Sequence, residues 1–246
     1  MFIYYLYGYK FYSNIEIINA PQFDGQLYFD TLRLIYTEIS SGCNHFGIDV
    51  KLEKEYCSIA FGDGTKYEID SVSGTIQAFA TGAQIIESTI LNLPFAILAA
   101  MRDSLLLHAS AIISNNFVMP IFAPKGTGKS TLTAKLSEHF EYFSDDTVYA
   151  TLNDNKIIAY YGSQIIKLYK DSSDALGLKR FSDKTNIQGK CYYYPSRVVK
   201  SASKAYNLHS LFFLTRSEDT YKLKIDKINS RNIKSIYLHS NICGID

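Results

Sequence analysis

The sequence predicts an α/β fold in which a small β-rich N-terminal domain, residues 1–81, precedes an α/β core, residues 82–246, built on a mixed sheet. Three observations predict this. Segments of the first eighty residues alternate polar and apolar side chains, as half-buried strands do. A helical spacing of apolar residues begins after Gly82. Further on, an apolar strand, a glycine-rich turn and an amphipathic helix follow each other directly, as in α/β proteins.

In the N-terminal part, residues 56–61 and 65–69 flank a Gly-Asp-Gly turn and predict a β-hairpin. Residues 14–17 alternate and predict a strand, and residues 75–80 predict one more. Residues 27–39 fit a strand or a short helix equally well. We expect the edge strands of this domain to dock a peptide by strand addition.

In the core, apolar residues at spacings of three and four predict a helix over residues 86–101, which Pro94 should kink or restart. Residues 105–113 form a continuous apolar run, which predicts one buried strand. A turn at Asn115–Asn116 should separate this strand from a second one at 117–122. A helix is predicted over residues 130–140.

Composition and charge exclude several classes of protein. The 246 residues are 47% hydrophobic and 20% charged, which is enough apolar matter for a core and too much for a disordered chain. The formal net charge is +1, so there is no electrostatic case for nucleic acid or an acidic membrane surface as a partner. We expect neither.

No targeting or membrane segment stands out. The longest apolar run, residues 90–101, is interrupted by Asn92 and Pro94 and is shorter than the roughly 20 residues that cross a bilayer. Residues 1–5 lack a basic region and a cleavage site, so we expect no signal peptide and a cytoplasmic location. The four cysteines form no CxxC pair and predict neither a disulfide framework nor a zinc site.

The turn after the 117–122 strand carries the chemistry, because it reads as a phosphate-binding loop between a strand and a helix. Backbone N–H groups of such a loop form a nest for phosphate oxygens, and the helix N-terminus adds a positive dipole end. The residues expected to bind the nucleotide are Ala123, Pro124, Lys125, Gly126, Thr127, Gly128, Lys129, Ser130 and Thr131.

Within this loop, Gly126 and Gly128 let the backbone come close to phosphate oxygens. Lys129 can reach the β- and γ-phosphates and neutralise developing charge, and the Ser130 hydroxyl can ligate Mg²⁺. Ala123 stands where the pattern usually begins with glycine, and alanine fits there if its φ is negative.

Behind the helix, Asp145 and Asp146 precede a strand at 147–152, a turn at 153–155 and a returning strand at 156–161. Taken alone, two aspartates are typical of a solvated turn. Beside a phosphate-binding loop they favour phosphoryl transfer, since one carboxylate can hold Mg²⁺ and the other can take a proton from an attacking hydroxyl.

Three motifs in one order, His108-Ala109-Ser110, Gly128-Lys129-Ser130 and Ser144-Asp145-Asp146, resemble the HPr kinase/phosphorylase-like family of P-loop kinases over about residues 82 to 225. The resemblance implies a core of the HPr-kinase/PEP-carboxykinase type. The larger N-terminal domain and the Glu-Ile-Arg-Gly signature of the HPr enzyme are missing. The chain is therefore more similar to short relatives that modify ribosomally made peptides, notably lasso-peptide kinases acting on a C-terminal serine of the precursor.

The resemblance also implies roles for individual residues. Asp145 matches the base on the substrate hydroxyl, Asp146 its neighbour near the metal, and His108 a histidine close to the phosphates. Lys190 matches a lysine of the family, and Lys167 a basic position. The implied set comprises Asp145, His108, Lys129 and Lys190 as catalytic residues, Ser130 and Asp146 as metal ligands, and ATP and Mg²⁺ as cofactors.

Several functions stay open at this point. The leading hypothesis is an ATP- and Mg²⁺-dependent kinase of a serine in a precursor peptide. The alternatives are a kinase of free serine or another small hydroxyl compound, an HPr-type protein serine kinase/phosphorylase, and a nucleotide-binding regulator without transfer activity. Ala123 and the end of the chain at Asp246, where further helical sequence is expected, favour the regulator. The relatives assemble, which leaves a homo-oligomer as an open possibility that the sequence does not decide.

Overall fold

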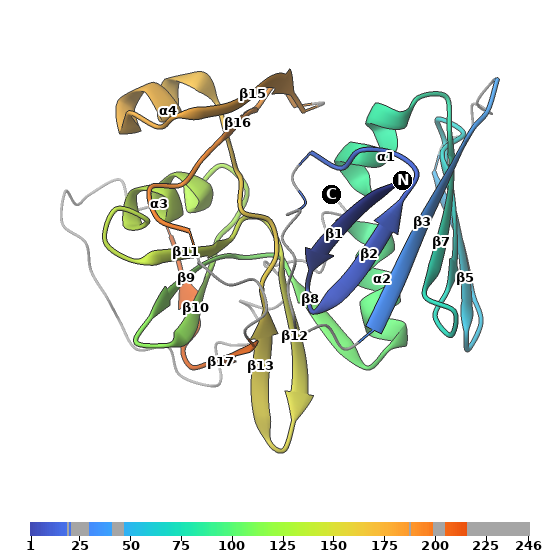
Figure 1. The fold of residues 1–246 in the computed structure, drawn as a ribbon, viewed down its shortest axis with the longest axis horizontal. Helices are drawn as coiled ribbons and strands as arrows, with labels where there is room; N and C mark the ends of the chain where they lie inside the picture. The colour runs from blue at the N-terminus through green and yellow to red at the C-terminus, as the bar shows by residue number, and fades with distance from the viewer. Residues whose placement is uncertain (19, 21–29, 41–46, 187, 199–204, 216–246) are drawn as a thin grey trace.

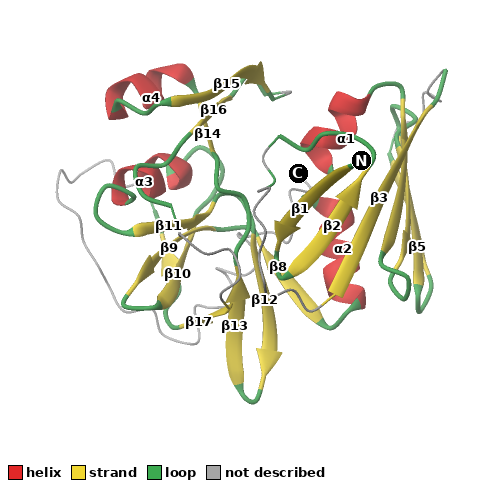
Figure 2. Cartoon of the chain, in the orientation of Figure 1, coloured by secondary structure: helices red, strands yellow, loops and turns green. Residues whose placement is uncertain are grey.

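The structure is a computed structural model, and it describes residues 1–18, 20, 30–40, 47–186, 188–198 and 205–215 (Figure 1). It is a mixed α/β protein made mostly of strands, which form three sheets within these residues. The helices are few and short beside the strands (Figure 2).

The N-terminal sheet has seven strands in the order β1-β2-β3-β7-β6-β5-β4. Its strands are β1 Phe2–Leu6, β2 Tyr9–Ser13, β3 Asp30–Glu38, β4 Ile48–Leu52, β5 Tyr56–Phe61, β6 Lys66–Asp70 and β7 Thr75–Ala80. The pairs β2–β3 and β3–β7 are parallel, and the remaining pairs are antiparallel. The predicted hairpin is confirmed as β5–β6, and the strand predicted at 75–80 is confirmed as β7.

Two other predictions for this region have clear outcomes. Residues 30–38 of the ambiguous segment form the strand β3, while residues 27–29 lie outside the described residues. The strand predicted at 14–17 is wrong, because side chains take over the backbone hydrogen bonds there. The Asn14 amide binds both the N–H and the C=O of Tyr36, at 2.7 and 2.8 Å, and the Ile17 N–H donates to the Tyr4 hydroxyl at 2.7 Å.

The predicted helix at 86–101 is two helices, α1 Ala83–Thr89 and α2 Leu93–Met101, with Pro94 in the first turn of the second. The prediction that Pro94 kinks or restarts the helix is confirmed. Among the described residues no single helix is long and apolar enough to span a membrane, whereas this pair, bent by 54°, meets that test on combined length and composition. Both helices contribute buried side chains to the core of the N-terminal sheet.

That core joins the two halves of the chain. Ile86, Phe95 and Leu98 of the helices pack in one cluster with side chains of the N-terminal sheet, and the cluster continues to Leu106 and Tyr149 of the next sheet. The domain boundary after residue 81 stays a prediction, and the apolar packing runs across it.

The second sheet has the order β11-β9-β10-β17-β13-β12-β8, with β18 also paired to β10. Its strands are β8 Ser104–Leu107, β9 Ser110–Ser114, β10 Phe117–Phe122, β11 Glu141–Ser144, β12 Val148–Asn153, β13 Lys156–Tyr160, β17 Ala205–Leu208 and β18 Phe212–Phe213. The predicted strands at 117–122, 147–152 and 156–161 are confirmed as β10, β12 and β13.

The single strand predicted at 105–113 is wrong, because the run breaks at His108 and Ala109 into β8 and β9. Only two residues connect these strands, yet β9 is the second strand in the sheet order and β8 is the last. The three Cα–Cα steps from Leu107 to Ser110 span at most about 11 Å. The sheet therefore curls so that its far strands approach each other at His108, around an apolar interior that includes Ala111, Val148 and Tyr161.

A third, three-stranded sheet, β14-β16-β15, and helix α4 lie beyond α3 Lys129–Leu136 (Figure 1). The strands are β14 Ile166–Leu168, β15 Arg180–Thr185 and β16 Cys191–Tyr193, and α4 spans Lys170–Leu176. Helix α3 ends earlier than predicted. The Ser137 hydroxyl donates to the Ala134 carbonyl at 2.6 Å and accepts the Ser196 N–H at 3.0 Å, which competes with continuation of the helix.

Candidate functional site

The glycine-rich turn connects β10 to α3 with the backbone that a phosphate loop needs. Gly126 and Gly128 have φ of 81° and 104°, a region that side chains other than glycine rarely adopt. A Cβ at either position would meet no atom within 4 Å, so backbone conformation rather than crowding requires glycine. Ala123 is buried and is not among the described residues with positive φ, which agrees with the condition under which alanine fits.

The loop is open where a nucleotide would bind. Pro124, Lys125 and Gly126 are exposed, and the Thr127 N–H donates to the Pro124 carbonyl at 3.2 Å, which closes the turn. Ser130 and Thr131 follow Lys129 in the first turn of α3, and all the remaining loop residues except Ala123 and Lys129 are half-buried. The first N–H groups of a helix have no partner within the helix, so those at the start of α3 are available to a ligand of the loop.

Lys129 and His108 lie side by side. The Lys129 Nζ is 3.3 Å from the His108 Nε2, and because an ammonium can only donate, the imidazole nitrogen accepts. Burial lowers the pKa of His108, and the neighbouring Lys129 lowers it further. Burial also lowers the pKa of Lys129, against the opposing effect of the aspartates. The break between β8 and β9 is what turns His108 toward the loop.

Asp145 is enclosed, and each of its two carboxylate oxygens accepts one hydrogen bond. Only 2% of the residue is exposed. Its Oδ1 accepts the Ser110 hydroxyl at 2.8 Å, and its Oδ2 accepts the Lys167 backbone N–H at 3.1 Å. These bonds tie the end of β11 to β9 on one side and to β14 on the other. They leave two of the four lone-pair positions of the carboxylate for other donors.

Asp146 is more open and carries an ion pair. Its side chain is 24% exposed, and its Oδ2 is 2.5 Å from the Lys167 Nζ. Burial acts to raise the pKa of Asp146, but Lys167 and Lys129 outweigh it and lower that pKa well below its usual range. Burial likewise acts to lower the pKa of Lys167, and Asp146 and Asp145 reverse this and raise it. The pair is therefore fully charged at neutral pH.

Asp146 has a left-handed backbone conformation and pairs with Lys167. Its φ is 64°, and the Thr147 N–H donates to the Asp145 carbonyl at 2.8 Å, closing a three-residue turn around Asp146. The Ser144 hydroxyl donates to the Thr147 carbonyl at 2.5 Å and braces the same turn. Left-handed backbone at a residue other than glycine is often retained at functional sites.

The N-terminal sheet also reaches this turn. Tyr7, in the turn between β1 and β2, bonds through its hydroxyl to the Thr147 hydroxyl, and its N–H donates to the Tyr161 carbonyl at 2.6 Å. Gly162 makes room, because a Cβ there would lie 2.6 Å from the Tyr7 ring and 2.7 Å from the Ser144 Oγ. Tyr7 couples the first two strands of the chain to the aspartate pair.

Of the predicted residues, the structure brings together His108, Lys129, Asp145 and Asp146. Lys190 is among the charges that act on Lys129, and its ammonium lies 5.6 Å from the centroid of the Tyr169 ring. Lys167, which sequence reasoning placed only at a basic position, contacts both aspartates. The signal that pointed to Lys167 was the sequence resemblance, which matches it to a basic position.

The donors suit Mg²⁺. The Asp146 carboxylate and the Ser130 hydroxyl offer oxygen atoms, which Mg²⁺ prefers as ligands. The Asp146 carboxylate already binds one cation, the Lys167 ammonium. Within the described ranges, no three His, Cys, Asp or Glu side chains gather into a metal site.

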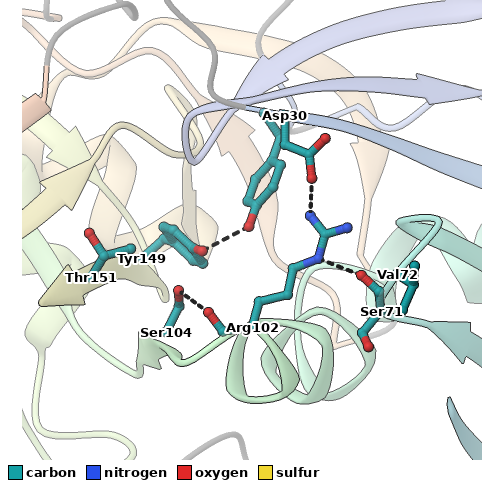
Figure 3. Close-up of a pocket in the computed structure, with 8 residues that line it drawn as sticks. Asp30, Ser71, Val72, Arg102, Ser104, Tyr149 and Thr151 are labelled. Atoms are coloured by element: carbon teal, nitrogen blue, oxygen red, sulfur yellow. Dashed lines mark hydrogen bonds and ion pairs between the residues drawn. The ribbon is translucent and has the colours of Figure 1, made fainter. Parts of the chain in front are cut away.

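A hollow of about 500 Å³ lies elsewhere, between the N-terminal sheet and the β8–β12 edge (Figure 3). Its polar groups are mutually bonded: the Arg102 guanidinium binds Ser71 at 2.8 Å and Asp30 at 2.5 Å, and the Tyr9 and Tyr149 hydroxyls are 2.9 Å apart. The hollow is lined by no residue of the glycine-rich turn, and neither Asp145 nor Asp146 lines it. The hollow is a junction between sheets rather than part of the candidate site.

No family profile and no curated protein sequence matches the chain. Among solved structures, the chain has a partial structural similarity to the Hpr(Ser) kinase/phosphatase from Coxiella burnetii, with a TM-score of 0.31 at 17% sequence identity. The similarity covers 49% of this chain and 65% of that one, so the chain spans less than two thirds of the structure that it matches. The chain is thus a mixed α/β protein with a weak structural resemblance to the HPr serine kinase/phosphatase.

Proposed function

We propose that the protein is an ATP- and Mg²⁺-dependent kinase that transfers the γ-phosphoryl group to a seryl hydroxyl. One observation carries the proposal: a strand–loop–helix turn with left-handed glycines presents Lys129 beside a hydrogen-bonded aspartate pair. A phosphate cradle, a cation and a carboxylate are the parts that phosphoryl transfer uses, since its catalysis is mostly positioning and charge stabilisation.

In the proposed reaction, the seryl oxygen forms a bond to the γ-phosphorus, the bond from phosphorus to the β–γ bridging oxygen breaks, and ADP leaves. The N–H groups of the loop and the Lys129 ammonium hold the phosphates. His108, neutral beside Lys129, accepts a hydrogen bond from the ammonium and fixes its direction. A bound Mg²⁺ would neutralise charge on the phosphates, with Ser130 and Asp146 as its ligands.

We assign different roles to Asp145 and Asp146. We assign proton acceptance to Asp145, because its Oδ1 already holds a seryl hydroxyl, that of Ser110, at 2.8 Å. The same carboxylate has lone pairs left for an acceptor hydroxyl. Asp146 is the more exposed member and is charged at neutral pH, which suits a metal ligand. Lys167 orients both, through its N–H on Asp145 and its ammonium on Asp146.

For the acceptor, we propose the C-terminal serine of a ribosomally made precursor peptide in the cytoplasm. The support is the resemblance of the three sequence motifs to short peptide-modifying kinases, together with a seven-stranded N-terminal sheet in the place where a larger domain is expected in the HPr enzyme. Free serine and HPr-type protein substrates serve as the competing acceptors in the test.

The test measures transfer from γ-labelled ATP with Mg²⁺ to a peptide ending in serine, the same peptide ending in alanine, free serine and an HPr-type protein. We expect labelling of the serine-ended peptide alone. Asp145→Asn should lower the rate by about a hundredfold or more while nucleotide binding is retained. Asp154→Asn, in the exposed β12–β13 turn, is the matched control and should leave the rate unchanged.

Other results would replace the proposal. Labelling of free serine would move the acceptor to a small molecule, and labelling of the HPr-type protein would move it to that class. Tight nucleotide binding without transfer to any acceptor would make the protein a nucleotide-binding regulator. Full activity of Asp145→Asn would refute the assignment of the base.

A further inference from the structure

The outer strand of the N-terminal sheet, β4, carries exposed apolar residues on one face. Ile48, Val50 and Leu52 are 45%, 52% and 66% exposed. They stand opposite Phe61, Ile59 and Cys57 of β5 in the antiparallel register, so they lie on the face that β5 buries. Cys57 and Ile59 are fully buried there. The apolar face of the sheet therefore continues past its covered part onto an open edge strand.

The hydrogen-bonding groups of β4 at this edge can be assigned. In an antiparallel ladder, alternate residues turn their N–H and C=O groups to opposite neighbours. The Glu53 N–H donates to the Tyr56 carbonyl at 2.8 Å where the β4–β5 hairpin closes, so Glu53, Lys51 and Asp49 face β5. Ile48, Val50 and Leu52 therefore point their N–H and C=O groups outward, and β4 is the last strand of the sheet among the described residues.

An outward row of this kind is a template for pairing with another strand. Two copies of β4 can pair antiparallel about a two-fold axis. The pairing requires that residues with outward N–H and C=O groups in one copy lie opposite residues with such groups in the other. Three central registers meet this condition. An axis at Asp49 sets Asp49 against its own copy, an axis at Lys51 sets Lys51 against its own copy, and an axis at Val50 sets Asp49 against Lys51 of the second copy, twice.

The charges choose among these registers. Like charges directly opposite each other destabilise a strand pair, and opposite charges stabilise it. With the axis at Val50, Ile48 also meets Leu52 of the second copy and Val50 meets Val50, all on the apolar face. A single register therefore satisfies the charges, the apolar residues and the backbone groups together.

We propose that β4 is a homodimer interface, in which two copies of the chain pair their β4 strands antiparallel about an axis at Val50 and join their seven-stranded sheets into one. Each of the three pairs with outward groups exchanges two backbone hydrogen bonds. In Figure 1 the β5 end of the sheet lies at the margin of the molecule away from α3 and α4, so pairing there leaves the glycine-rich turn accessible.

Sedimentation equilibrium over a range of concentrations tests the proposal. We expect the full chain to dimerise. Asp49→Lys and Lys51→Asp each set like charges opposite each other twice, and each should raise the dimer dissociation constant by about tenfold or more. The double variant, Asp49→Lys with Lys51→Asp, restores both opposite pairs and should dimerise like the unchanged chain. Asp154→Lys, an exposed charge reversal in another hairpin, is the control and should have no effect.

Mixing the two single variants separates a specific interface from damage to the fold. One variant then offers two positive residues and the other two negative ones, so an equimolar mixture should form a heterodimer, although each variant alone is monomeric. A misfolded variant would not regain association in this way. A monomeric unchanged chain, a double variant that does not recover, or a mixture that stays monomeric would overturn the proposal. Saturable binding of an extended peptide to a monomeric chain at β4 would also overturn it.

Discussion

Replacing Lys167 with methionine removes the ammonium that is 2.5 Å from the Asp146 carboxylate and keeps the backbone N–H that binds Asp145. Exposed ion pairs contribute about 0–1 kcal/mol, and breaking a buried pair costs about 3–5 kcal/mol. With 13% and 24% of the two side chains exposed, this pair lies between these cases. We expect Lys167→Met to lower the free energy of unfolding by about 2 kcal/mol.

Urea unfolding of Lys167→Met, Asp146→Asn and the double variant gives the coupling energy of the pair. We expect about 1–2 kcal/mol at pH 7. Lys135→Met breaks the exposed pair with Glu138 and is the matched control, with an expected cost below about 1 kcal/mol. A Lys167–Asp146 coupling below about 0.5 kcal/mol would refute the argument that Lys167 holds Asp146 in place.

The pH dependence of the same variants provides a second check. The folded-state pKa of Asp146 is lowered, since Lys167 and Lys129 outweigh its burial. The stability from this group is therefore fully present above its ordinary pKa, near 3.9, and is lost as the pH falls below that value. The stability advantage of the unchanged chain over Asp146→Asn should be constant from pH 5 to 8 and should shrink below about pH 4.

Three further changes test other parts of the site. Gly128→Ala, at φ 104°, should cost about 1–3 kcal/mol and weaken nucleotide binding in a titration, whereas Gly177→Ala, at φ 61° in the C-cap of α4, should cost stability alone. His108→Gln should flatten the fall in stability as the pH drops below about 6.5, by at most about 1.4 kcal/mol per pH unit. The reason is that burial lowers the pKa of folded His108, so the unfolded chain takes up more protons in that range. Tyr7→Phe leaves the buried Thr147 hydroxyl without this bond and should cost about 1–2 kcal/mol in urea unfolding; no loss would show that the bond does not couple the N-terminal sheet to the turn.

Local patterns predicted the elements that hold the phosphate loop. The strands predicted at 75–80 and 117–122 are β7 and β10 with the same bounds. Each is decided by the burial of its own side chains, which a local pattern records. The glycine spacing predicted the turn, since positive φ at Gly126 and Gly128 is a local requirement. The Asp145–Asp146 pair was found because it lies behind the phosphate loop and its helix, directly before a predicted strand.

Contacts between distant segments were beyond prediction from one sequence. Lys167 reaches Asp146 across 21 positions and Tyr7 reaches Thr147 across 140, and no local pattern encodes either contact. The break at His108 was hidden for a related reason. Leu107 and Ala109 are as apolar as a continuous strand would require, and only the curl of the sheet separates β8 from β9.

The two-residue step between β8 and β9 has a consequence for how the chain folds. β9 pairs with β10, which follows within a few residues, whereas β8 pairs with β12, some forty residues later. The β9–β10 hairpin is thus a local event on the microsecond scale, while β8 waits for the closure of a long loop. His108 takes its place beside Lys129 only when that late pairing closes the sheet, so the site should be among the last parts of the protein to assemble.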